Sequence, residues 1–94
     1  MVVATCVIVL SLPGVSSLKE KRRIVKSILH RLPHQFNVAV AEVDYHDVWQ
    51  TAAIALVTTG VDAGYLHRLL EKAVTWLEDS RPDVPIDDYV IEFR

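Results

Sequence analysis

Cysteine is almost missing from the sequence: its single example, Cys6, lies in a run of valine and isoleucine. One cysteine can form neither an internal disulfide nor an all-thiolate metal site, so nothing in the chain requires an oxidising compartment. The apolar neighbours of Cys6 favour a buried core thiol over a reactive one. A fold stapled by disulfides is therefore excluded.

Targeting signals are missing from the apolar N-terminal stretch, MVVATCVIVLSLPGVSS. No Lys or Arg precedes the apolar run, no A-x-A cleavage site follows it, and the run is too short to span a bilayer. Its β-branched residues favour a strand instead. We therefore expect a cytoplasmic protein with no membrane partner.

Complete catalytic motifs are also lacking. The Gly-x4-Gly-Lys-Ser/Thr spacing of a P-loop does not occur, and the spacing assembles no Ser-His-Asp or Cys-His arrangement. The polar segment 44–47 has no second ligand pair of matching spacing, which argues against a metal site. We expect no enzymatic activity, no metal and no cofactor. The function that remains is binding.

What the chain does have is enough apolar material for one core. Of its 94 residues, 51% are apolar and 23% are charged, which is globular composition. We therefore expect a single domain over residues 1–94.

Apolar periodicity predicts four strands and two helices. The strands are expected at residues 2–12, 37–43, 51–58 and 86–93. A capping box of Ser17 and Glu20 begins a helix at Leu18, and Pro33 is expected to end it. Asp62 is a good N-cap for a second helix, whose apolar stripe reaches Leu77.

The resulting βαββαβ order predicts an α+β, ferredoxin-like fold, a four-stranded antiparallel sheet with both helices on one face. The other face should then show alternating polar residues, but the first and third strands are apolar on both sides. An uncovered apolar sheet face is unusual for a monomer, and a second copy of the chain is the simplest cover. A homodimer through the sheet face is therefore expected.

Positive charge is concentrated on the first helix. Residues 17–36 carry six Lys and Arg side chains against one carboxylate, a net of +5, so the rest of the chain carries −7 of a total of −2. At about 100° per residue, most of these side chains gather within roughly a third of the circumference. The candidate nucleic-acid-binding residues are Lys19, Arg22, Arg23, Lys26 and His30, with Arg31 at the edge.

Two interpretations of this stripe remain open. Acidic partners at i,i+4 are almost absent, so intrahelical pairing does not neutralise the stripe, and it could face the phosphates of a nucleic acid. Alternatively, the charges simply solvate the outer face of an amphipathic helix. The loop at 13–17 points N–H groups toward the helix N-terminus, where anions are favoured, but Glu20 occupies part of that position.

Lys21 differs from the other cations because it falls within the apolar stripe. An unpaired ammonium is costly to bury, so Lys21 must extend to solvent or find a carboxylate. Glu42 or Asp44, at the end of the second strand, can supply one. An ion pair and a ligand-binding role both remain open.

Aromatic residues give no sign of base stacking on the sheet. The central strands offer Val, Ala, Ile and Thr, and no RNP-type aromatic motif occurs. If RNA is the partner, recognition should run through phosphates. Trp49 and Trp76 are interpreted as core or interface anchors.

Several short stretches resemble the YlxP-like family of small bacterial proteins, whose function is unknown. They are SLKEKRR at 17–23, FNV at 36–38, AEVD at 41–44 and WQ at 49–50. The resemblance implies a ferredoxin-like fold of about this length and a genomic neighbourhood of translation-initiation and ribosome-maturation genes. It implies no catalytic residues.

Two functions follow as hypotheses. The first is a small cytoplasmic protein that associates with RNA or the ribosome and contacts phosphates through its basic helix. The second is a homodimeric regulatory or scaffold domain that binds a small ligand or a protein through its open sheet face.

Overall fold

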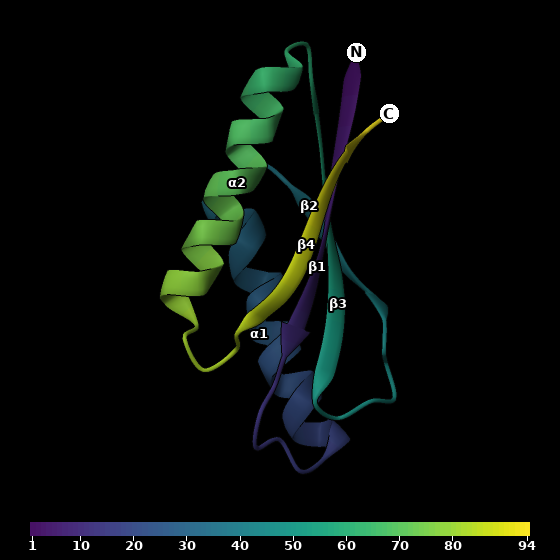
Figure 1. Ribbon diagram of the computed structural model, residues 1–94, viewed down its shortest axis with the longest axis vertical. Helices are drawn as coiled ribbons and strands as arrows, with labels where there is room; N and C mark the ends of the chain where they lie inside the picture. The colour runs from purple at the N-terminus through teal and green to yellow at the C-terminus, as the bar shows by residue number, and fades with distance from the viewer.

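Six elements follow one another in the order that apolar periodicity predicts. The computed structural model describes residues 1–94. Its elements are β1 (Val2–Ser11), α1 (Leu18–Gln35), β2 (Ala39–Asp44), β3 (Thr51–Gly60), α2 (Ala63–Ser80) and β4 (Ile86–Phe93). The four strands form one sheet in the order β2-β3-β1-β4, and every neighbouring pair is antiparallel (Figure 1). This confirms the ferredoxin-like α+β fold.

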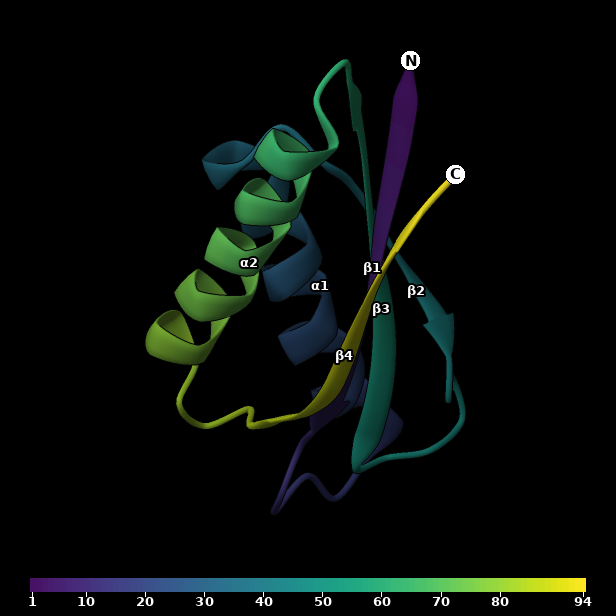
Figure 2. The same ribbon diagram turned by 45° about the horizontal axis from the view of Figure 1, so that its top comes forward.

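Both helices lie on the same side of the sheet, as Figure 2 shows. Alternation along β1 explains which side they cover: Ala4, Cys6, Ile8 and Leu10 are completely buried, while the residues between them are not. These side chains join apolar residues of β3, α1 and α2 in one hydrophobic cluster. Neither helix carries an apolar stretch that would let it span a lipid bilayer.

Both helices begin at the residues that the sequence predicts. Ser17 Oγ accepts a hydrogen bond of 3.1 Å from Glu20 N, which satisfies one free N–H of the first turn of α1. The Glu20 carboxylate accepts from Ser16 N at 3.4 Å, so this arm of the capping box reaches one residue further back. In α2, Asp62 Oδ1 accepts from Gly64 N at 2.9 Å and Tyr65 N at 3.3 Å.

The prediction that Pro33 ends the first helix is wrong, because α1 continues to Gln35. Proline removes one intrahelical bond, the one that residue 33 would donate to the carbonyl of Leu29. In the last turn this loss is confined to a single bond, and Phe36 N still donates to Leu32 O at 2.9 Å. The helix therefore closes two residues beyond the proline.

Strand boundaries shift by one or two residues from those expected. Strand β2 begins at Ala39 rather than at residue 37, and β3 runs to Gly60 rather than ending at residue 58. The Asn37 carbonyl leaves the ladder and accepts a hydrogen bond of 2.9 Å from Thr58 Oγ1. A side-chain bond therefore replaces the backbone pairing at this corner.

The uncovered sheet face is apolar along β1 and β3, as the doubly apolar strands indicate, but its β4 edge carries Asp88 and Glu92. In the sheet register, Val7 of β1 lies between Ala55 of β3 and Val90 of β4. On neighbouring positions of this face, Val57 is 40% exposed and Val90 is 50% exposed. We call this uncovered side of the sheet the open face.

Candidate nucleic-acid interface

The outward side of α1 carries a basic surface made of Lys19, Arg22, Arg23, Lys26 and His30. All five side chains are exposed. They lie opposite the side of the helix that packs on the sheet, which is buried at Val25, Ile28 and Leu32. The helical period therefore separates a packed apolar side from an exposed cationic one.

No carboxylate neutralises this basic surface. The ion pairs of the structure are Lys21 with Glu42, His67 with Glu71, and Arg81 with Asp83. None of them involves the basic surface, and no side-chain hydrogen bond does either. The charge is thus available to an anion from solvent.

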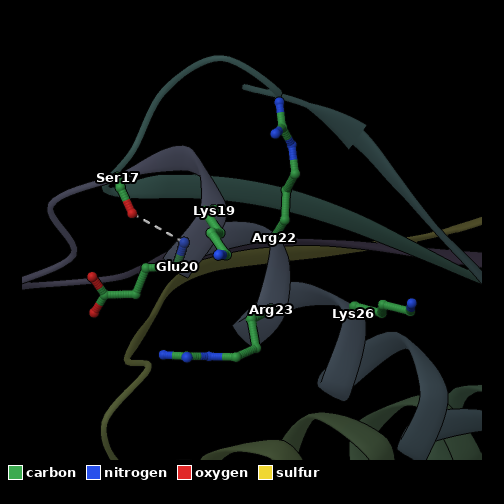
Figure 3. A pocket seen from close by; sticks show the side chains of 6 residues that line it. All are labelled: Ser17, Lys19, Glu20, Arg22, Arg23 and Lys26. Atoms are coloured by element: carbon green, nitrogen blue, oxygen red, sulfur yellow. Dashed lines mark hydrogen bonds between the residues drawn. The ribbon is translucent and has the colours of Figure 1, made fainter.

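A shallow hollow of about 560 Å³ lies at the N-terminal end of the basic surface, lined by Ser17, Lys19, Glu20, Arg22, Arg23 and Lys26. Figure 3 shows Arg22, Arg23 and Lys26 pointing in three different directions rather than converging on one point. Glu20 is the one carboxylate here, and it is hydrogen-bonded to Ser16. Cations spread in this way suit an extended polyanion better than a single small anion.

Arg31, expected at the edge of the stripe, faces α2 instead. Its guanidinium carbon lies 5.0 Å from the centre of the Trp76 ring, a cation–π arrangement. Phe36 meets the same ring edge-on at 6.0 Å. Arg31 therefore belongs to the contact between the helices rather than to the basic surface.

Lys21 is only 1% exposed and contacts residues at the C-terminal end of β2. Its Nζ lies 3.3 Å from Glu42 Oε2 and donates a hydrogen bond to the carbonyl of Tyr45. Tyr45 has a positive φ of 61°. Asp44 forms no ion pair with Lys21, and its Oδ1 accepts from Tyr45 N at 2.7 Å. Of the two carboxylates that the sequence offered, Glu42 is the partner, and the pair ties α1 to the β2–β3 turn.

The two tryptophans differ in their surroundings. Trp76 is half-buried against the hydrophobic cluster. Trp49 lies in the β2–β3 connection and is 49% exposed, next to Val48 at 45%. Trp49 is thus not a core residue, whereas Trp76 packs as an anchor between the helices.

Chemistry at Cys6 is disfavoured by its position. Burial raises the pKa of the Cys6 thiol to about 11, and the negative charge of Glu71 adds to the rise. The thiol is therefore protonated at neutral pH, and a protonated thiol is a poor nucleophile. No three His, Cys, Asp or Glu side chains gather as a metal site would require.

Sequence reasoning missed a groove between the C-terminal end of α1 and the N-terminal half of α2. Its cations, Arg68 and Lys72, belong to α2, which carries no basic run of its own. Their spacing of four residues is the one signal that places them on a shared side. That they face Phe36 follows only from the packing of the two helices.

A model of the family described as "Protein of unknown function (DUF503)" matches residues 3–90. The chain belongs to the DUF503 family. This DUF503 protein is 32% identical over 68 residues to the "Uncharacterized protein YlxP" of Bacillus subtilis (strain 168), which covers 72% of this chain and 73% of that protein. The resemblance to the YlxP-like family is therefore confirmed.

Among solved structures, the DUF503 chain is similar to the de novo designed protein Foldit4. The TM-score is 0.55 at 14% sequence identity, covering 100% of this chain and 97% of the designed one. At this identity the likeness supports the fold alone.

Proposed function

We propose that this DUF503 protein is a small cytoplasmic RNA-binding protein that holds the phosphates of single-stranded RNA on its basic surface. A role in ribosome assembly or translation is part of the proposal. The observation that carries it is the basic surface itself, five exposed basic side chains on one side of α1 with no carboxylate partner.

Electrostatics supports an extended polyanion as the partner. Each neutralised phosphate releases condensed counterions, so several dispersed cations bind a nucleic-acid strand without forming a pocket. The residues outside 17–36 carry a net charge of −7, which disfavours a polyanion over much of the remaining surface. A strand is therefore expected to bind along this helix.

Charge reversal tests the proposal. We expect the triple variant Arg22→Glu, Arg23→Glu, Lys26→Glu to bind a fluorescently labelled single-stranded RNA at least 100-fold more weakly than the wild type at low salt, measured by anisotropy. All three side chains are exposed, so the fold should persist, which circular dichroism can check.

A single reversal provides the matched comparison. Arg22→Glu and Arg94→Glu change the net charge equally, but Arg94 lies at the end of the chain beyond β4. We expect about tenfold weaker binding for the first and less than twofold for the second. Equal effects of the two substitutions, or a triple variant that binds like the wild type, would refute the proposal.

A second candidate function is a homodimeric regulatory or scaffold domain, and the apolar open face favours it. Stable dimers bury self-complementary surfaces, and the Val and Ala side chains of β1 and β3, with Val90 of β4, suit such a contact. The helices cover the opposite side, so such a dimer would leave both basic surfaces outward.

Sedimentation tests the dimer. We expect a mass of two chains at micromolar concentration for the wild type and of one chain for Val57→Lys, whose side chain is already 40% exposed. A wild-type mass of one chain would rule the dimer out.

A further inference from the structure

The groove between the helices combines aromatic and cationic side chains. It has a volume of about 340 Å³, within the range of small-ligand sites. The helices run in opposite directions, so the C-terminal end of α1 lies beside the N-terminal half of α2 (Figures 1 and 2). Three ring or aliphatic side chains line it: Phe36, Tyr65 and Leu69.

The aromatic side of the groove is partly fixed and partly open. Phe36 is half-buried and held by its edge-on contact with Trp76, with an interplanar angle of 77°. Tyr65 is 58% exposed, and its hydroxyl has no hydrogen-bond partner. A planar ring can therefore enter from solvent and lie against Tyr65.

The polar side of the groove is cationic. Arg68 and Lys72 stand one helical turn apart, both are exposed, and neither pairs with a carboxylate. Gln35 and Asn37 add amide groups at the end of α1, whose side chains form no hydrogen bonds within the chain. The groove thus offers ring stacking, positive charge and amide donors and acceptors together.

This combination selects one class of ligand. A purely apolar molecule would leave two cations without a counter-charge, and a simple inorganic anion would leave the aromatic side unused. A nucleotide fits both, because its base stacks on aromatic rings, its phosphate meets Arg or Lys, and its base edge bonds to amides.

We propose that the groove holds one unpaired nucleotide of the bound RNA strand, with its base against Tyr65 and Phe36 and its phosphate near Arg68. This inference rests on the proposed function, since the strand is the one whose phosphates lie on the basic surface. Arg23 precedes Phe36 by 13 residues, about 20 Å along α1, or about six nucleotides at 3.4 Å each. An eight-nucleotide strand can therefore contact Arg23 on the basic surface and Phe36 in the groove at the same time.

The test compares an eight-nucleotide uridine strand with an abasic strand of the same length. Both carry the same phosphates, so the basic surface binds them equally. Base–aromatic contact should make the uridine strand bind wild-type protein at least fivefold more tightly. Tyr65→Ala should abolish this preference and leave the affinity for the abasic strand unchanged. Tyr89→Ala, an exposed tyrosine on β4 outside the groove, should keep the preference.

The outcomes separate the two proposals. If the wild type binds both strands equally, or Tyr65→Ala keeps the preference, the groove inference is wrong while RNA binding by the basic surface stands. If neither strand binds, the proposed function fails and the groove inference fails with it. Uridine monophosphate that binds as tightly as the uridine strand would show a free-nucleotide site and overturn the strand as occupant.

Discussion

Lys21 shows how one buried cation can be kept in an apolar interface. Its ammonium forms an ion pair with Glu42 and donates a hydrogen bond to the carbonyl of Tyr45. Removing one partner of a buried pair is costly because the other charge is left unpaired. The pair therefore holds the β2–β3 turn against α1. It thereby also fixes the position of the basic surface, which α1 carries.

Breaking this pair from one side should destabilise the fold. We expect Lys21→Met to lower the free energy of unfolding by about 3 kcal/mol in urea titrations. Glu42 Oε2 is buried without a hydrogen bond, so the variant removes the one cation that compensates its charge. The double variant Lys21→Met, Glu42→Leu should recover at least half of that loss. A cost below about 1 kcal/mol for the single variant would show that the pair is not a structural tie.

Cys6 gives the protein a defined sensitivity to alkaline pH. Its folded-state pKa of about 11 lies above the ordinary value of 9.0, so folding favours the protonated thiol. The associated stability is present in full below pH 9 and is lost as the pH rises toward 11. At pH 10.5 the free energy of unfolding is lower by about 2 kcal/mol as a result.

The measurement is urea unfolding of the wild type and of Cys6→Ala between pH 8 and 10.5. We expect the free energy of unfolding of the wild type to fall by about 2 kcal/mol more than that of the variant over this range, because every other side chain is the same in both. Parallel curves for the two proteins would contradict the assigned burial of the thiol.

At the scale of elements, the sequence predicts a helix boundary correctly where a single residue determines it. Ser17 and Asp62 cap the helices as predicted, because an N-cap side chain bonds to N–H groups only two or three residues away. Pro33 misled the prediction because its local penalty is outweighed by the packing of Leu32 and the closing bond of Phe36. The position of Arg31 beside Trp76 likewise depends on α2, which no local pattern shows.

The cost of Pro33 can be measured directly. We expect Pro33→Ala to raise the free energy of unfolding by about 1 kcal/mol, because residue 33 can then donate to the carbonyl of Leu29. The loop residue Pro82 is the control: Pro82→Ala should lower stability slightly by freeing the unfolded chain. A destabilised Pro33→Ala protein would mean that the last turn of α1 requires the proline.

At the scale of the molecule, charge and apolar surface lie on opposite sides. The basic surface covers the outside of α1, while the open face lies on the far side of the sheet. The sequence predicts which side of α1 is exposed and which side of β1 is buried, since each follows from a simple period of 3.6 or 2 residues. The groove between the helices could not be predicted from the sequence, because residues 35–37 and 65–72 meet only in the folded chain.

The salt dependence of RNA binding tests the central claim most directly. About four phosphates held by the basic surface predict a slope near −3 when the logarithm of the association constant is plotted against that of the salt concentration. Neutralising Arg22 as Arg22→Gln should reduce the slope by about 0.7. A flat plot from low to moderate salt, or a slope indifferent to Arg22, would show that the basic surface does not hold the phosphates of RNA.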